Sequence, residues 1–204
     1  MKRYAFVDVD MTIVDGNLGT IFARELLKKG PRRIYLRSKW RFILYLIKSA
    51  YILFLYPFSF LYPVYVFLQD ASTDRFFDLV ESWREDEAEE AARRAAQKAK
   101  LPKESLAFLQ KLHESGYEIV LLSATPSIVL KHLVERLPVP VRFVGTDENH
   151  REPMFSHVKA KIIQTEFRDG IPAIVAGNPK REPFWLARER KIVVRRPREL
   201  ARYL

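Results

Sequence analysis

The sequence of 204 residues is long enough for one domain with a hydrophobic core, and its lack of cysteine excludes a disulfide-stapled mini-protein, thiol catalysis and cysteine-ligated metal centres. Hydrophobic residues make up 48% and charged residues 29%, which is typical of globular rather than disordered chains. The 35 Lys and Arg residues against 25 Asp and Glu residues give a net charge of +10, which favours an anionic partner such as a phosphorylated metabolite, an acidic lipid surface or a nucleic acid.

The first predicted element is a short buried strand over residues 4–9. Lys2 and Arg3 precede it, but Asp8 and Asp10 interrupt the apolar run, which is too short for the hydrophobic stretch of an export signal. We therefore expect an amino terminus that faces the cytoplasm and a strand that ends in two carboxylates.

Residues 17–100 differ in composition from the rest of the chain and are interpreted as an all-helical cap. Residues 40–69 hold 11 of the 26 aromatic residues, and residues 49–69 carry no charge. A straight helix of the latter length would reach about 30 Å, roughly the thickness of a bilayer's hydrocarbon core. Pro57 and Pro63 each remove a helical hydrogen bond. The sequence therefore predicts an apolar hairpin over about residues 40–69 rather than one spanning rod.

Basic residues precede and enter this hairpin. Residues 21–48 contain nine Lys or Arg residues and a single acid, and the basic residues include Arg32, Arg33 and Arg37. Each basic side chain near an anionic leaflet contributes about 1 kcal/mol of attraction, and aromatic side chains favour the headgroup region. We expect this segment to contact an anionic phospholipid membrane and these arginines to bind anionic headgroups. The alternatives are a buried hairpin within the cap and a contact between two copies of the chain.

Residues 74–100 are predicted to form one or two amphipathic helices, after which short apolar runs alternate with helical patterns. The predicted strands cover residues 4–9, 118–123, 141–144, 173–176 and 191–194, and the predicted helices between them cover residues 103–115, 126–137 and 158–167. This alternation predicts an α/β fold, in which a doubly wound, Rossmann-like parallel sheet is formed by residues 1–16 and 101–204 and the cap is inserted between them. Ligands of such sheets bind beyond the carboxyl ends of the strands.

The first strand ends in Asp8 and Asp10, which are two residues apart and so lie on the same face of an extended segment. Two adjacent negative charges are stabilised by a hard cation such as Mg²⁺. A carboxylate beside such an ion can attack a phosphoryl group while its neighbour transfers a proton. This pair therefore indicates phosphoryl chemistry.

Two further strand ends carry polar groups. Ser123 precedes the helix predicted to start near Pro126, where a hydroxyl and free backbone N–H groups form an anion cradle, although an ordinary helix cap explains the same residues. Asn178 and Glu182 follow the strand predicted at residues 173–176 and supply a carbonyl oxygen and a carboxylate; an ordinary turn is the alternative here.

Together these positions resemble the haloacid dehalogenase-like phosphatase superfamily over essentially the whole chain. Its Asp-x-Asp-x-Thr motif is matched by Asp8, Asp10 and Thr12, its strand-ending Ser or Thr by Ser123, its Lys by Lys159 or Lys161, and its fourth motif by Gly177, Asn178 and Glu182. The insert resembles the cap of the phosphoserine-phosphatase-like branch. The apolar hairpin within it resembles that of the membrane-bound phosphatidylglycerophosphatase C type.

The resemblance implies a role for each matched residue. Asp8 would be the nucleophile that accepts the phosphoryl group, Asp10 the general acid and base, and Lys159, preferred over Lys161, the neutralising cation. The implied phosphate and substrate contacts are the Ser123 hydroxyl, the Ala124 N–H and Thr12. The implied ligands of Mg²⁺ are Asp8, Asp10, Asn178 and Glu182.

Three residues depart from the family pattern. Asn178 and Glu182 stand where Asp is usual, so the cation would lose one anionic ligand, and Met11 replaces a common Gly in the loop over the metal. Because the nucleophile, its partner acid, a Ser and a Lys are all present, a working enzyme is favoured over a non-catalytic relic.

We expect a Mg²⁺-dependent phosphomonoesterase that works through an aspartyl phosphate. The favoured substrate is a lipid phosphate, phosphatidylglycerophosphate by resemblance, at the cytoplasmic face of the cell membrane. A soluble-substrate phosphatase such as a phosphoserine phosphatase is the alternative, together with a non-catalytic relic. No nucleic-acid partner is expected, because no interleaved basic and aromatic groove motif accompanies the charge.

Overall fold

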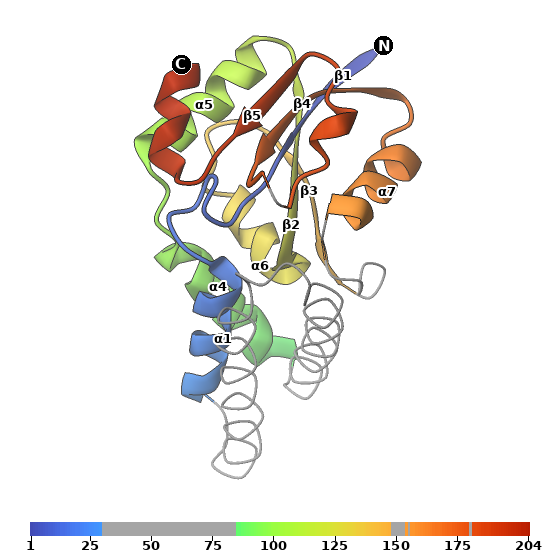
Figure 1. Ribbon diagram of the computed structural model, residues 1–204. Coiled ribbons are helices and arrows are strands. Elements are labelled where there is room, and N and C mark those ends of the chain that lie inside the picture. Colours follow the sequence, from blue (N-terminus) through green and yellow to red (C-terminus); the bar gives the residue numbers. More distant parts are fainter. Residues whose placement is uncertain (30–84, 148–153, 155, 180) are drawn as a thin grey trace, which may run out of the picture.

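The fold is taken from a computed structural model, shown in Figure 1, which describes residues 1–29, 85–147, 154, 156–179 and 181–204. Within these residues, five parallel strands form one sheet in the order β3-β2-β1-β4-β5. The strands are β1 (Lys2–Val7), β2 (Glu118–Pro126), β3 (Arg142–Thr146), β4 (Gly170–Gly177) and β5 (Arg190–Val193). The predicted α/β class with a doubly wound parallel sheet is confirmed.

Helices cover both faces of the sheet, and Figure 1 shows α5 on one side and α7 on the other. One face packs against α5 (Lys103–Glu114), α6 (Ser127–Val134) and the 3-10 helix η3 (Pro197–Tyr203). The other face packs against α7 (Ser156–Glu166) and the short 3-10 helix η2 (Phe184–Leu186). Each face therefore has its own hydrophobic core.

The alternation of side chains along β1 divides the two cores. Ala5 and Val7 join the core of α5 and α6, whereas Tyr4 and Phe6 join the core of α7. All four side chains are buried. A strand that is buried on both faces has an uninterrupted apolar sequence, which explains why this strand was recognisable from the sequence.

Two helices of the insert are described, α1 (Leu18–Lys29) and α4 (Glu85–Lys98). They pack against each other, and their apolar side chains continue the core of α5 and α6. The backbone N–H of Asp15 donates to the carbonyl of Lys100 at 2.9 Å, so the chain enters and leaves the insert at adjoining points. The exact boundaries of the cap stay a prediction.

Several predicted features lie outside the described residues. They are the apolar hairpin, the three arginines Arg32, Arg33 and Arg37, and residues 74–84 of the predicted amphipathic stretch. Among the helices that the structure describes, none combines the length and the apolar character needed to span a membrane.

Candidate active site

The carboxyl ends of β1, β2 and β4 lie side by side, because β1 is the central strand and pairs with both of the others. We call this place the catalytic edge. Side chains from three strand ends and from α7 contact one another there through hydrogen bonds. The residues gathered at the catalytic edge are Asp8, Asp10, Ser123, Thr125, Lys159 and Glu182.

Lys159 lies between two carboxylates. Its ammonium Nζ donates to Oδ1 of Asp8 at 3.0 Å and to Oε1 of Glu182 at 2.5 Å, and the side chain is buried. Lys161, the other candidate from the sequence, is exposed on α7. The structure therefore brings Lys159, and not Lys161, to the predicted nucleophile.

One ammonium cannot neutralise two buried carboxylates. Burial, with the negative charge of Asp8 added to it, raises the pKa of Glu182 to about 8 even though Lys159 opposes the shift. Burial also disfavours the charged form of Lys159, but the two carboxylates outweigh this effect and raise its pKa above the usual value. Lys159 thus keeps its positive charge, and Glu182 retains its proton to a higher pH than an exposed glutamate does.

Gly177, the last residue of β4, leaves room for this cluster. A Cβ at this position would lie 2.6 Å from Cγ of Glu182 and 2.8 Å from Cβ of Asp8. Both distances are well below a van der Waals contact, so a side chain would push one of the two acids away. A glycine is therefore needed here for Asp8 and Glu182 to reach the same lysine.

Asp10 is held from two sides. Its Oδ1 accepts a hydrogen bond from the backbone N–H of Leu18, the first residue of α1, at 2.8 Å, and its Oδ2 accepts one from the hydroxyl of Thr125 at 3.1 Å. Burial, reinforced by the charge of Asp8, raises the pKa of Asp10 to about 6, and the two hydrogen bonds oppose the shift. A carboxyl group with such a pKa can hold or release a proton close to neutral pH, as a general acid and base must.

A tight loop connects β1 to α1. The carbonyl of Val9 accepts hydrogen bonds from the three successive N–H groups of residues 12–14, and the N–H of Met11 donates to the carbonyl of Gly16. Met11 has a φ of 58° and is 42% exposed. Glycine adopts this left-handed conformation without strain. The backbone at position 11 therefore favours glycine, the residue that is common there in the family.

Thr12 and Ser123 are both fully buried. The hydroxyl of Thr12 lies 3.5 Å from Oδ2 of Asp8, and Oγ of Ser123 accepts a hydrogen bond from the N–H of Thr125 at 3.1 Å. Ser123 accepts this bond and keeps its own hydroxyl proton, and the contacts of both hydroxyls with substrate stay predictions. Ala124, in contrast, is exposed at the catalytic edge, where its backbone can meet a ligand.

Residues 5–169 match the family of haloacid dehalogenase-like hydrolases. The chain belongs to this family. A comparison with curated proteins found no match. Two solved structures are similar. A Bordetella pertussis Tohama I protein of unknown function has a TM-score of 0.71 and 15% identity, with 100% of this chain and 96% of that chain covered. Phosphoserine phosphatase from T. onnurineus, in complex with NDSB-201, has a TM-score of 0.56 and 19% identity, with 100% and 94% covered.

The two structural likenesses show a shared fold. The family match confirms the expected superfamily and the expectation of an enzyme, a hydrolase. The finer resemblance to phosphatidylglycerophosphatase C stays a prediction, as do the roles assigned to the single residues.

The catalytic edge of this haloacid dehalogenase-like hydrolase fits a magnesium ion that has few protein ligands. Among the described residues, no three acidic or histidine side chains gather around one metal position, and one oxygen of Glu182, a predicted ligand, accepts a hydrogen bond from Lys159. Mg²⁺ needs only one or two carboxylates and completes its shell with waters and phosphate oxygens. Asp8 and Asp10 are two such carboxylates, and the negative charge of Asp8 adds to the raised pKa of Asp10. Asn178, partly exposed after β4, adds a neutral oxygen.

Sequence reasoning missed two residues at the catalytic edge of this haloacid dehalogenase-like hydrolase. Thr125 contacts Asp10, and it had a signal: it lies two residues after Ser123 at a strand end, so both side chains fall on one side of the strand. Arg181 is exposed, and its charge opposes the burial that raises the pKa of Asp10 and of Glu182. No pattern marks Arg181, because its position depends on the turn that begins at Asn178.

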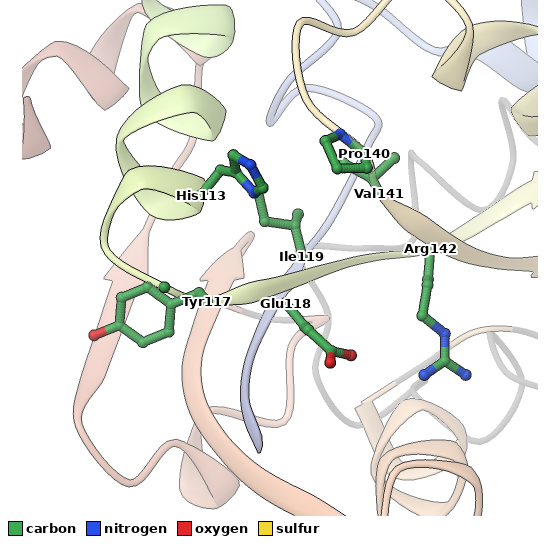
Figure 2. Close-up of a pocket in the computed structure, with 8 residues that line it drawn as sticks. His113, Tyr117, Glu118, Ile119, Pro140, Val141 and Arg142 are labelled. Carbon is green, nitrogen blue, oxygen red and sulfur yellow. The ribbon is translucent and has the colours of Figure 1, made fainter. Parts of the chain in front are cut away.

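A separate hollow of about 430 Å³ lies at the opposite, amino-terminal end of β2 and β3, and Figure 2 shows it in close-up. His113 and Pro140 lie on one side of β2, whereas Glu118 and Arg142 point to the other side. Glu118 also pairs with Lys2 at 3.4 Å. Because its polar side chains diverge, this hollow lacks the converging groups of the catalytic edge.

Proposed function

We propose that this chain is a Mg²⁺-dependent phosphomonoesterase that acts through an aspartyl phosphate on a lipid phosphate, with phosphatidylglycerophosphate as the favoured substrate, at the cytoplasmic face of a membrane. The observation that carries the chemistry is the contact of the buried Lys159 ammonium with Asp8, beside an Asp10 carboxyl whose pKa is raised to about 6 by burial. A buried carboxylate next to a fixed positive charge suits attack on an anionic phosphate ester.

In the first step, a carboxylate oxygen of Asp8 forms a bond to phosphorus while the bond from phosphorus to the ester oxygen breaks. The proton on Asp10 goes to the departing alkoxide, which leaves as an alcohol. In the second step, a water molecule gives a proton to Asp10 and attacks phosphorus, so that the bond to Asp8 breaks and inorganic phosphate leaves. Lys159 stays charged throughout and offsets the negative charge on Asp8 and on the phosphate.

A bound Mg²⁺ would supply further positive charge for the phosphate oxygens and for the carboxylates that hold it. Asp8, Asp10 and the side-chain oxygen of Asn178 would hold the ion. One oxygen of Glu182 accepts a hydrogen bond from Lys159, and its other oxygen stays a predicted ligand of the ion.

The lipid substrate is supported by the sequence of the insert. Residues 49–69 are uncharged and rich in aromatic side chains, and nine basic residues fall within residues 21–48. An apolar segment next to a basic one suits a surface that combines acyl chains with anionic headgroups. The fold shared with a phosphoserine phosphatase supports a second candidate, a soluble phosphomonoester such as phosphoserine.

The decisive experiment compares phosphate release from phosphatidylglycerophosphate in mixed micelles with release from phosphoserine, with Mg²⁺ and with EDTA. We expect Mg²⁺-dependent release that is faster from the lipid, and we expect Asp8→Asn to abolish it. Asp15→Asn, at an exposed position in the same loop, is the matched control and should keep the activity. Equal rates on both substrates would remove the lipid assignment, and activity in Asp8→Asn would remove the aspartyl-phosphate mechanism.

The membrane location is tested in the same preparation by flotation with vesicles. The wild type should float with vesicles that contain anionic lipid and not with neutral ones. Replacement of Arg32, Arg33 and Arg37 by Gln should weaken this binding by about 100-fold, because each basic residue contributes about 1 kcal/mol at an anionic surface. Binding that is unchanged in the triple variant would contradict the assignment of these arginines.

A further inference from the structure

Among the residues that the structure describes, Thr125 is the only one whose side chain donates a hydrogen bond to Asp10. Its hydroxyl lies 3.1 Å from Oδ2 of Asp10, and the residue is 1% exposed. The other carboxylate oxygen, Oδ1, is held by the backbone N–H of Leu18. Each oxygen of a carboxylate can accept more than one hydrogen bond, so both keep capacity toward a substrate or a water. The two donors together fix the plane of the carboxylate, and its oxygens can still exchange a proton with a substrate or a water.

The position of Thr125 is itself fixed by its neighbours. Its backbone N–H donates to Oγ of the buried Ser123 at 3.1 Å. On the other side, Gly145 of β3 lets the strand approach closely, since a Cβ there would lie 2.6 Å from the carbonyl oxygen of Thr125 and 2.9 Å from the N of Ser127. The pairing of β2 with β3 is also irregular between Leu122 and Pro126. This local irregularity presents the Thr125 hydroxyl to Asp10 across two strands.

We propose that Thr125 is a positioning residue: its hydroxyl holds Oδ2 of Asp10 so that the acid faces the ester oxygen of the substrate and, later, the attacking water. The proposal rests on the proposed function, because it assigns Thr125 to the proton transfer of that reaction. Thr125 touches neither the phosphate nor the nucleophile in this role and acts through Asp10 alone.

If Thr125 positions Asp10, the effect of its loss on the rate depends on the leaving group of the substrate. An alkoxide is a poor leaving group and needs a proton from Asp10 as the ester bond breaks, whereas nitrophenolate leaves readily without one. The ratio kcat/KM covers only the steps up to departure of the alcohol. Misplacement of Asp10 should therefore lower kcat/KM for an alkyl phosphate much more than for nitrophenyl phosphate.

The test measures kcat/KM on glycerol phosphate and on nitrophenyl phosphate for the wild type, Thr125→Val and Thr125→Ser. We expect Thr125→Val to lose about 10- to 100-fold on the alkyl phosphate, since small misplacements of a catalytic group have effects of this size. The loss on nitrophenyl phosphate should stay within about threefold, because that ester does not need the proton. Thr125→Ser keeps a hydroxyl and should restore most of the alkyl activity.

Thr146→Val is the matched control. Thr146 is a buried threonine at the end of the neighbouring strand β3, and its hydroxyl donates to the carbonyl of Ala124 at 2.9 Å and not to Asp10. This variant should change both substrates by the same factor. An equal loss on both substrates in Thr125→Val, or a failure of Thr125→Ser to restore the alkyl activity, would overturn the positioning role.

Crystal structures of the wild type and of Thr125→Val provide a readout that does not depend on activity. We expect a single orientation of the Asp10 carboxylate in the wild type. In the variant, we expect the carboxylate to be rotated or to have two alternate conformers. An unchanged carboxylate would overturn the proposal even if activity fell. Inactivity of the wild type on every phosphate ester would instead overturn the proposed function. The two crystal structures would then decide whether Thr125 positions Asp10.

Discussion

At the scale of single residues, Glu182 shows how a departure from the family pattern is accommodated. A glutamate is one methylene longer than the aspartate usual at this position, and its carboxylate reaches Lys159 at 2.5 Å. Gly177 makes room for that longer side chain, because a Cβ at position 177 would lie 2.6 Å from Cγ of Glu182. The glutamate thereby contacts the same lysine as Asp8.

Met11 provides a prediction at the same scale. Its φ of 58° costs a non-glycine residue about 1–2 kcal/mol, whereas a glycine adopts it freely. Part of this gain is offset by the greater freedom of glycine in the unfolded chain, about 0.4–1 kcal/mol. Met11 is 42% exposed, so Met11→Gly also gives up the burial of the rest of the side chain, which opposes the relief of strain. We expect thermal unfolding to show a Tm within about 2 °C of the wild type.

The matched control for Met11 is Val193→Gly, which removes a similarly exposed apolar side chain from the ordinary extended backbone of β5. Val193 has no strained φ angle that a glycine would relieve, and glycine weakens a strand, so this variant should lower the Tm. A fall in Tm in Met11→Gly as large as that in Val193→Gly would mean that the φ angle of Met11 carries no strain.

Much of the catalytic edge was predictable from single residues, but their contacts were not. The spacing of Asp8 and Asp10 at a strand end indicated a pair of acids at a ligand-binding edge, and the structure places both there. The local pattern favoured Lys159 but left Lys161 open, because the packing of α7 on the sheet decides which of the two is buried. The contact of Thr125 with Asp10 joins positions 115 residues apart, and it depends on strand order and on the irregular end of β2.

At the scale of elements, helix α4 of the insert is tied to the sheet domain through its carboxyl end. The last carbonyls of a helix lack partners within the helix. Arg136, just beyond α6, donates from Nη1 to the carbonyls of Ala96 and Ala99 at this end. Further along α4, Glu89 accepts hydrogen bonds from Lys131 at 3.2 Å and contacts His132 at 2.9 Å. α4 and α6 are thus joined by polar contacts over several turns.

We expect Arg136→Met to weaken this connection. The variant keeps much of the aliphatic length but leaves the two carbonyls without the guanidinium, at a cost of about 1–3 kcal/mol for hydrogen bonds to a charged group. Because the loss is local, amide hydrogen exchange should accelerate in α4 more than in β1 or β4. Arg168→Met, at an exposed position after α7, is the control and should leave exchange in α4 unchanged. Uniform acceleration across the sheet would show that α4 unfolds only with the whole domain.

The elements of the sheet domain were predicted closely because their apolar runs are buried on both sides. The run at residues 4–9 became β1 at Lys2–Val7, shifted because Lys2 and Arg3 pair with β4 while Asp8 and Val9 already belong to the loop. The helix predicted at residues 126–137 begins at Ser127, since Pro126 still pairs with Thr146 of β3. Such boundaries depend on tertiary pairing, which a local pattern does not contain.

At the scale of the whole molecule, the insert and the catalytic edge are adjacent. Figure 1 shows α1 and α4 beyond the same end of the sheet as the loop after β1. The N–H of Leu18 at the start of α1 donates directly to Asp10, so the first turn of the insert forms part of the site. The insert thus helps to set the orientation of Asp10, the proposed acid.

Protons and Mg²⁺ act on the stability of the whole molecule through the same carboxylates. Burial raises the pKa of Glu182 from its usual 4.5 to about 8 in the folded protein. The folded state then holds this proton more tightly than the unfolded state, so the stabilisation is full below about pH 4.5 and is lost as the pH rises to about 8. Burial likewise raises the pKa of Asp10 from 3.8 to about 6, and its contribution is lost between about pH 4 and 6.

In EDTA, we therefore expect the Tm to fall from pH 6 to pH 8, with Glu182 as the main cause. Glu182→Gln cannot ionise and should flatten this fall, whereas Glu114→Gln, at an exposed position on α5, should not. Added Mg²⁺ should raise the Tm more at pH 8 than at pH 6, because the ion competes with protons for its ligands. A Tm that rises with pH in EDTA, or an equal Mg²⁺ effect at both pH values, would mean that these acids stay ionised throughout.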